Sequence, residues 1–131
     1  MVVVSSLASD TVWPQTLPYN TAKAAQHALV RNTALRLAKH GVRVNAVLCG
    51  AIHTEALDAM AAQVGTPSDA YAAKRGAAHP LGRCGTSAEV AHAVLFLASP
   101  LAGFICGALL PVDGGLSLTN WFNTKEMMAP K

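Results

Sequence analysis

Three short apolar segments, separated by helical stretches, constrain the fold of this chain more than any other feature. Residues 1–5 are rich in valine, residues 42–48 place apolar side chains at alternating positions, and residues 108–112 are apolar and contain Pro111. Such runs predict strands, and the proline is typical of a strand at a sheet edge. Because helical stretches lie between the strands, the order predicts a parallel sheet with right-handed crossovers.

Two of the helical stretches carry end signals. Residues 19–40 predict one long helix with two apolar stripes, which favours burial on two sides, against the sheet and against a second helix. Gly41 supplies the left-handed residue that ends such a helix. Thr86 and Glu89 have the spacing of a capping box, which predicts that another helix opens there and continues to residue 98.

The remaining segments are predicted from their turn residues. Residues 6–18 read as a loop, and residues 113–115, Asp-Gly-Gly, read as a structural turn. Residues 55–76 are alanine-rich and helical with a break near residues 65–67, which makes them a candidate mobile lid. The predicted fold class is therefore α/β: half of a doubly wound, Rossmann-like parallel sheet of three strands with crossover helices, in one partial domain over residues 1–131.

Composition and charge exclude several classes of protein. Hydrophobic residues make up 52% of the 131 residues and charged residues 13%, which excludes a disordered chain. The net charge of +3 comes from scattered basic residues, which favours a solvated helix face over a nucleic-acid surface. No apolar run reaches the roughly 18 residues of a membrane span, and no signal-peptide pattern opens the chain, so a cytoplasmic protein is expected.

The cysteines and histidines predict no metal site. The three cysteines are too widely spaced for a disulfide framework or a zinc pattern, and buried, inert thiols are expected at Cys49, Cys84 and Cys106. None of the five histidines has metal-ligand spacing. The roles of three aromatic residues stay open at this point. Trp13 fits either a pocket lining or a cover over apolar surface, and packing or subunit contacts are expected for Trp121 and Phe122.

Chemistry-bearing residues gather in the first part of the chain. Tyr19 and Lys23 are four residues apart, so both project from one face of the predicted helix. A lysine ammonium beside a phenol stabilises the phenolate and suits the tyrosine to proton transfer near neutral pH. Ser6 follows the first strand, at the carboxyl end of the sheet, where open α/β folds bind ligands. The spacing alone is common on helix surfaces, so the context of strand, serine and helix carries the interpretation.

With these residues in place, the sequence resembles the short-chain dehydrogenase/reductase family over nearly its whole length. The family's Ser-Ser strand end and its Tyr-x-x-x-Lys motif match residues 2–6 and 19–23. Its Pro-Gly-x-Ile-x-Thr loop matches residues 49–54, with Cys49 where the family usually has proline. Five further motifs also stand in the family's order: Arg-Val-Asn at 43–45, Pro-Leu-Gly-Arg at 80–83, Glu-Val-Ala at 89–91, Phe-Leu-Ala-Ser at 96–99 and Val-Asp-Gly-Gly at 112–115.

The resemblance implies a function and a set of site residues. It implies hydride transfer between NAD or NADP and a small alcohol or carbonyl substrate, in a homo-oligomer. Ser6 would orient the substrate oxygen, Tyr19 would donate or accept the proton, and Lys23 would hold the nicotinamide ribose beside the tyrosine. Loss of the loop proline at residue 49 frees a backbone N–H and is expected to loosen the loop. Within that loop the resemblance assigns cofactor contacts to Gly50, Ile52 and Thr54.

A second hypothesis rests on what the sequence lacks. The family's glycine-rich phosphate loop and its Asn-Asn-Ala-Gly stretch precede the serine strand, and neither pattern occurs in these 131 residues. The chain is therefore expected to match the C-terminal half of the family and to turn over poorly by itself. The alternative to an oxidoreductase is a non-catalytic, truncated member of the family that acts, if at all, through oligomer contacts.

Overall fold

The computed structural model describes residues 1–11 and 16–119, so Trp13, Trp121 and Phe122 lie outside the described residues. The chain divides into two compact units. The first unit comprises Met1–Cys49 and Ala88–Val112, and the second comprises Gly50–Ser87 and the chain from Asp113 onward.

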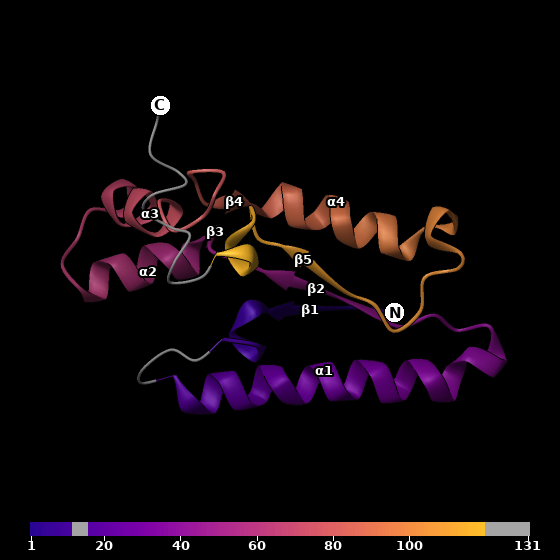
Figure 1. The fold of residues 1–131 in the computed structure, drawn as a ribbon. Coiled ribbons are helices and arrows are strands. Elements are labelled where there is room, and N and C mark those ends of the chain that lie inside the picture. The colour runs from indigo at the N-terminus through magenta and orange to yellow at the C-terminus, as the bar shows by residue number, and fades with distance from the viewer. Residues whose placement is uncertain (12–15, 120–131) are drawn as a thin grey trace. The chain divides into compact units, whose positions relative to one another are not determined.

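The first unit is built on a parallel sheet of three strands (Figure 1). The strands are β1 (Val2–Ser6), β2 (Asn45–Cys49) and β5 (Leu109–Val112), in the order β1-β2-β5. This confirms the predicted α/β fold and its three parallel strands. It also places the strand that contains Pro111 at one side of the described sheet, where a missing N–H is tolerated.

The second strand begins later than residue 42, where the sequence pattern placed its start. The amide of Val42 donates to the Leu37 carbonyl at 3.3 Å, so it closes the preceding helix instead of joining the sheet. Gly41, with a φ of 73°, makes the left-handed turn that permits this bond. The ladder then starts with the Asn45 amide, which donates to the Met1 carbonyl at 3.1 Å.

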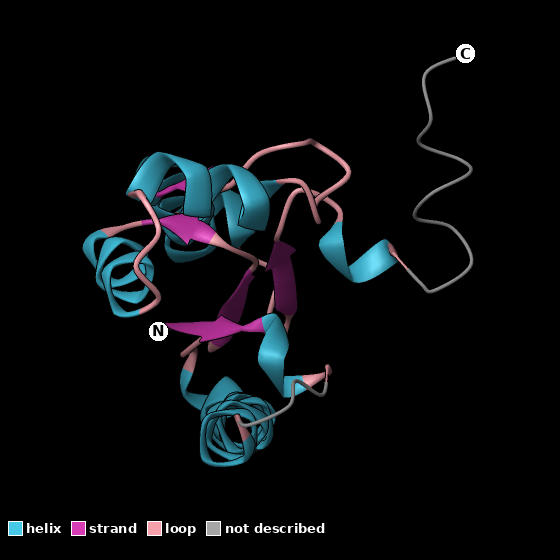
Figure 2. Ribbon diagram, turned by 90° about the vertical axis from the view of Figure 1, so that its left-hand side faces the viewer, coloured by secondary structure: helices cyan, strands magenta, loops and turns pink. Residues whose placement is uncertain are grey.

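Two helices cover the two faces of this sheet. Helix α1 (Leu17–Leu37) and helix α4 (Ser87–Ala98) lie along opposite faces, as Figure 1 shows, and the turned view of Figure 2 again places α1 along one face. Helix α1 begins two residues before the predicted start at residue 19 and includes Pro18 in its first turn. Proline is tolerated there because the N–H groups of a first turn have no partner within the helix. A 3₁₀ turn, Ala38–His40, extends the helix to Gly41.

Only one of the two apolar stripes of α1 is covered within the chain. Val30 and Ala34 are buried, whereas Ala22 and Ala25 are exposed and Leu29 is 58% exposed. On the other face of the sheet, Leu97 and Ala102 pack against Val47 of β2. The predicted second helix against the outer stripe of α1 therefore stays a prediction.

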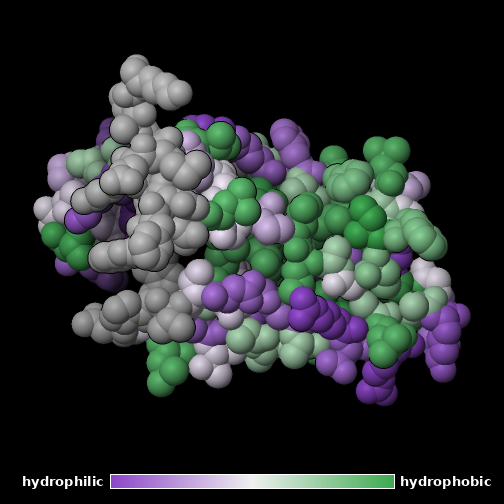
Figure 3. Space-filling model, viewed as in Figure 1, coloured by the Kyte–Doolittle hydropathy of each residue, from purple (hydrophilic) through white to green (hydrophobic). Residues whose placement is uncertain are grey.

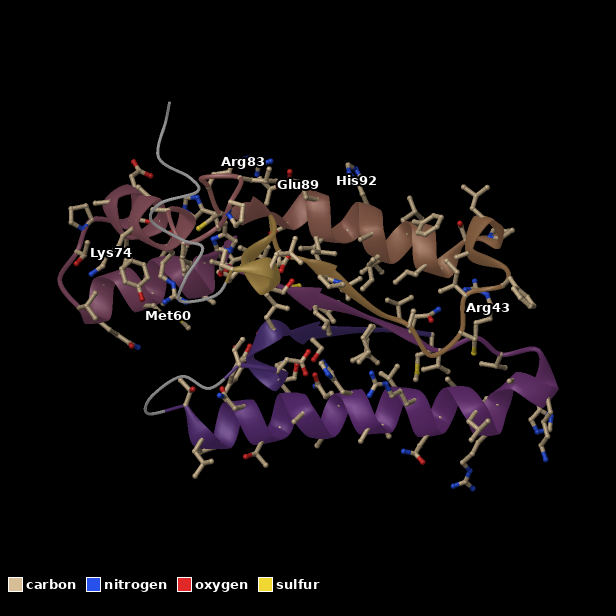
Figure 4. All side chains as sticks on the ribbon, in the orientation of Figure 1. Arg43, Met60, Lys74, Arg83, Glu89 and His92 are labelled. Atoms are coloured by element: carbon tan, nitrogen blue, oxygen red, sulfur yellow. The ribbon has the colours of Figure 1, made fainter. Side chains whose placement is uncertain are left out.

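Two polar side chains tie the start of β2 to the segment after α4. Asn45 is fully buried; its side-chain amide donates to the Ile105 carbonyl at 3.0 Å, and its oxygen accepts from the Ala108 amide at 2.9 Å. The Arg43 guanidinium, labelled in Figure 4, donates to four carbonyls that follow from the end of α4: those of Leu97 (2.8 Å), Ser99 (3.0 Å), Ile105 (3.3 Å) and Ala98 (3.5 Å). The Arg-Val-Asn motif is thus structural in this chain.

The second unit contains two helices and a pair of two-residue parallel strands. Helix α2 (Glu55–Gln63) and helix α3 (Ser68–Gly76) confirm the helical stretch and its break, at which Gly65 has a φ of 65°. Strands β3 (Ile52–His53) and β4 (Gly85–Thr86) were not predicted, because two residues are too few for an alternating pattern. Among the described residues, no helix combines the length and apolar character needed to cross a membrane.

Candidate active site

Ser6 lies at the carboxyl end of the first unit's sheet, as the sequence predicts. It is the last residue of β1 and pairs in register with Cys49, the last residue of β2. Its Oγ accepts a hydrogen bond from the Ala8 amide at 3.2 Å, which caps the 3₁₀ turn Leu7–Ser9. This bond fixes the hydroxyl oxygen, and a hydroxyl that accepts in this way still has its own proton to donate.

Tyr19 and Lys23 form a pair on one face of α1. The Lys23 Nζ lies 5.5 Å from the centroid of the Tyr19 ring, which is within the range of a cation–π contact. Tyr19 is 50% exposed, so its phenol is open to a ligand. The structure thereby brings the two side chains together as their four-residue spacing predicts.

The start of α1 lies beside the segment that follows Ser6. The side-chain amide of Asn20, next to Tyr19, donates to the Thr11 carbonyl at 2.9 Å. Figure 1 shows the start of α1 at the end of the first unit where β1 ends. Ser6, Tyr19 and Lys23 therefore lie at the same end of the first unit, and their roles there stay a prediction.

The cysteines differ from the buried thiols that the sequence predicts. Cys49 and Cys84 are half-buried, and Cys106, in the loop before β5, is exposed, so the predicted burial is wrong for Cys106. Burial raises the pKa of the Cys49 thiol, and the Lys23 ammonium opposes that rise. That the thiols are inert stays a prediction.

In the second unit, the loop predicted to bind the cofactor is held tightly. A Cβ atom on Gly50 would lie 2.8 Å from the His79 Nε2 and 3.0 Å from the Asp113 Cα, so only glycine fits there. Ile52 follows in β3, paired with Gly85, and is partly buried. The residue after Cys49 is thus closely packed, and the loosening expected from the loss of the loop proline stays a prediction.

Thr54 stands at the start of α2 with an extended backbone. Its carbonyl accepts from the amides of Leu57 and Asp58, at 2.8 and 3.1 Å, and so begins the helix. Its side chain makes no capping hydrogen bond to the helix. The hydroxyl is thus available to a ligand, as the resemblance implies for this position.

Sequence reasoning missed one residue of this loop's surroundings, His79. Its ring is 2% exposed; Nε2 accepts from the Ala51 amide at 3.0 Å, and Nδ1 faces the Arg75 carbonyl at 3.1 Å. No spacing signal could have found it, because its partner amide lies 28 residues earlier in the chain. The only local hint is its place directly before the Pro-Leu-Gly-Arg turn.

Asp58 ties helix α2 to its neighbours. Its Oδ1 accepts from the Ser68 hydroxyl at the start of α3 and lies 3.2 Å from the His53 Nε2. The Ser68 hydrogen bond, with a smaller effect of His53, lowers the pKa of Asp58 despite slight desolvation. These contacts fix the two candidate lid helices to each other at their facing ends. Among residues 1–11 and 16–119, no group of three or more acidic, histidine or cysteine side chains could hold a metal ion.

The turn at Asp113 is held by its own carboxylate. Oδ1 accepts from the Gly115 amide at 3.0 Å and Oδ2 from the Ser117 amide at 2.7 Å, and Gly114 and Gly115 both have positive φ. Partial burial raises the pKa of Asp113, but the hydrogen bonds from Ser117 and Gly115 outweigh it, so the pKa lies below its ordinary value. The predicted structural turn is confirmed.

This lowered pKa gives a pH-dependent stability. A carboxyl whose pKa falls on folding stabilises the fold above its ordinary value, here 3.8, and loses that contribution as the pH falls through the folded value. We expect Asp113→Asn to lower the free energy of unfolding by about 1 kcal/mol at pH 7, discounted for partial exposure. The difference from the wild type should shrink below pH 3.8 in urea denaturation at several pH values. Parallel pH profiles for the two proteins would contradict the assignment.

Comparison with known proteins supports the motif analysis. A model of the family described as enoyl-(acyl carrier protein) reductase matches residues 1–117. The chain is 39% identical over 117 residues to L-rhamnose 1-dehydrogenase (NAD(P)(+)) of Sphingomonas sp. (strain SKA58). The matched region covers 88% of this chain and 44% of that protein. The chain thus spans about half the length of the curated relatives it matches.

Comparison with solved structures agrees with these sequence matches. Aldohexose dehydrogenase of Thermoplasma acidophilum superposes with a TM-score of 0.87 at 36% identity, over 95% of this chain and 50% of that one. A short chain dehydrogenase family protein of Francisella tularensis gives 0.81 at 30% identity, over 90% and 51%. Carveol dehydrogenase of Mycobacterium avium, solved in complex with NAD, gives 0.79 at 30% identity, over 90% and 46%. The chain therefore belongs to the short-chain dehydrogenase/reductase family.

Proposed function

We propose that this chain carries the catalytic and nicotinamide-side residues of an NAD(P)-dependent oxidoreductase that acts on a small alcohol or carbonyl compound. The proposal is supported by two observations: the Lys23 ammonium lies 5.5 Å from the Tyr19 ring centroid, and the start of α1 lies at the end of the first unit where β1 ends in Ser6. An ordinary surface Tyr-Lys pair would not have a capped serine hydroxyl at the end of the adjacent strand.

Each residue has a defined role in the proposed reaction. The Ser6 hydroxyl donates a hydrogen bond to the substrate oxygen and orients it. In alcohol oxidation the Tyr19 oxygen takes the hydroxyl proton, and in carbonyl reduction it returns a proton to the same oxygen. The Lys23 ammonium stabilises the negative charge that develops on the phenol oxygen as its proton leaves. The bound nicotinamide supplies the hydride acceptor or donor.

The loop of the second unit fits a nicotinamide nucleotide. Packing against His79 and Asp113 admits only glycine at residue 50, which holds the backbone of the loop in one place. Ile52 offers an apolar contact and Thr54 a hydroxyl that the helix does not use. We propose that Gly50, Ile52 and Thr54, with Tyr19 and Lys23, hold the nicotinamide side of NAD or NADP. A relative named for NAD(P)(+) and another solved with NAD support this choice.

The test is hydride transfer in a complete fold. The chain is joined in frame to the glycine-rich, nucleotide-binding half of a short-chain dehydrogenase, and the absorbance of reduced nicotinamide at 340 nm is followed with a panel of sugars, secondary alcohols and ketones. We expect turnover with at least one substrate and a loss of at least about tenfold in Ser6→Ala, since that substitution removes the orienting donor. The matched control is Ser9→Ala, whose hydroxyl donates to the Ser6 carbonyl and is not assigned to the substrate.

The second candidate function, a non-catalytic member that acts through oligomer contacts, is favoured by exposed apolar side chains of the first unit. Figure 3 shows apolar surface over α4 and the loop after it. There Leu95 is 67% exposed, Leu101 is 84% exposed and Phe104 is fully exposed. The exposed stripe of α1 adds small residues that permit close helix contact.

The turnover assay discriminates the two candidates, and sedimentation velocity over a concentration series tests the self-association that both expect. Exposed apolar surface of this extent favours contact between the 131-residue chain and a second copy. A concentration-independent monomer would contradict the oligomer expectation. Self-association without turnover in the joined protein would favour the non-catalytic candidate.

A further inference from the structure

We propose that His79 is a positioning residue that fixes the loop from Gly50 to Ile52 by accepting the hydrogen bond of the Ala51 amide. The inference rests on the proposed function, because this loop is the one assigned to the nicotinamide side of the cofactor. His79 itself is buried and is not assigned a contact with substrate or cofactor.

The two ring nitrogens of His79 have opposite roles. Nδ1 faces the Arg75 carbonyl at 3.1 Å, and a carbonyl oxygen only accepts, so Nδ1 carries the proton. Nε2 is then unprotonated and accepts from the Ala51 amide at 3.0 Å. Because His79 is only 2% exposed, neither bond is readily exchanged for water, so the two bonds select the Nδ1–H tautomer.

Ala51 is held on both sides of its backbone. Its amide donates to His79, and its carbonyl accepts from the Gly85 amide at 2.9 Å. The β3–β4 ladder begins at the next residue, where Ile52 pairs with Gly85. Removal of the His79 acceptor would therefore leave a partly buried amide unsatisfied at the point where the ladder begins.

Close packing makes this contact sensitive to small changes. The His79 Nε2 lies 2.8 Å from the place a Gly50 Cβ would take, so the ring forms one wall of the glycine's space. The Asp113–Gly115 turn lies against the same ring: a Cβ on Gly114 would lie 3.7 Å from the His79 Cδ2. Loop, histidine and turn thus support one another within the second unit.

Two conservative substitutions separate the acceptor from the donor. Glutamine places its amide oxygen near the position of Nε2, so His79→Gln keeps an acceptor for Ala51. Asparagine places its amide nitrogen near Nδ1, so His79→Asn keeps the donor toward Arg75 and loses the acceptor for Ala51. The two variants differ by one methylene group and are matched controls for each other, and His79→Leu removes both hydrogen bonds.

The experiment is amide hydrogen exchange and ¹⁵N NMR on the 131-residue chain. In the wild type we expect the His79 ring to show the Nδ1–H tautomer. The Ala51 amide should exchange at least about tenfold faster in His79→Asn and His79→Leu, and within about threefold of the wild type in His79→Gln. Exchange at Val47, in the core of the first unit, monitors global folding. An Nε2–H tautomer, or equal Ala51 exchange in the Gln and Asn variants, would overturn the proposal.

A second readout separates this inference from the proposed function. In the joined protein, His79→Asn should raise the KM for the nicotinamide cofactor at least about fivefold, with kcat changed less than twofold, and His79→Gln should restore the wild-type KM. If the joined protein has no turnover, the proposed function fails while the exchange result still stands. If kcat falls and KM does not change, the positioning role is wrong.

Discussion

Replacing Tyr19 with phenylalanine is expected to lower turnover of the joined protein by about 10²–10⁴-fold while cofactor binding survives. The substitution removes only the phenol oxygen, which is the atom assigned to proton transfer, and keeps the ring that lies beside the Lys23 ammonium. The measurement is kcat from the change in absorbance at 340 nm, with cofactor affinity from the quenching of protein fluorescence. More than a tenth of the wild-type kcat would show that the assigned role is wrong.

The neighbouring lysine provides a contrasting variant. Lys23→Ala is expected to weaken both turnover and cofactor binding, because the proposal assigns the same ammonium to the tyrosine and to the nicotinamide ribose. The control on the same helix is Arg31→Ala, which removes a positive charge at an exposed position two helical turns further along. Equal effects of Lys23→Ala and Arg31→Ala would indicate a general loss of charge and contradict the specific role of Lys23.

The second large effect concerns stability. Asn45→Leu is expected to lower the free energy of unfolding by about 2–4 kcal/mol. The fully buried side chain satisfies the Ile105 carbonyl and the Ala108 amide, and leucine would leave both groups without those bonds. Because these bonds hold the segment that leads into β5, the loss should appear as unfolding of the first unit, followed by circular dichroism in urea.

The chain offers a matched control for that substitution. Asn32→Leu makes the same chemical change on the exposed side of α1, where the amide donates only to the Ala28 carbonyl one turn earlier. A change within about 0.5 kcal/mol is expected there. If Asn45→Leu were as mild as Asn32→Leu, the buried amide would not be the anchor described above.

The parts of the fold that could be predicted are those with local causes. The valine run of β1, the glycine that ends the α1 region, and the Gly-Pro break between α2 and α3 each act within a few residues. The start of β2 could not be predicted, because it depends on the Val42 amide bonding back to Leu37. Strands β3 and β4 depend on pairing between segments more than thirty residues apart, and two-residue strands carry no pattern of their own.

The candidate site also has some features that local sequence predicts and others that depend on distant contacts. The helical spacing of Tyr19 and Lys23 and the position of Ser6 after a strand place these residues from sequence alone. The support of the cofactor loop could not be predicted, because a lone histidine and an aspartate in a turn have no spacing signal. Their roles at Gly50 depend on three segments that meet only in the folded second unit. The roles in catalysis and in cofactor binding remain predictions.

Saturation-transfer difference NMR of the 131-residue chain with NADH tests the central claim most directly, because it reports which protons of a bound dinucleotide touch the protein. The proposal assigns residues of this chain to the nicotinamide side, and no glycine-rich phosphate loop occurs within the 131 residues, so weak binding through the nicotinamide end is expected. The account predicts saturation at the nicotinamide protons well above that at the adenine protons, and a clear reduction in Thr54→Val. Saturation at the adenine protons equal to or above that at the nicotinamide protons would contradict it.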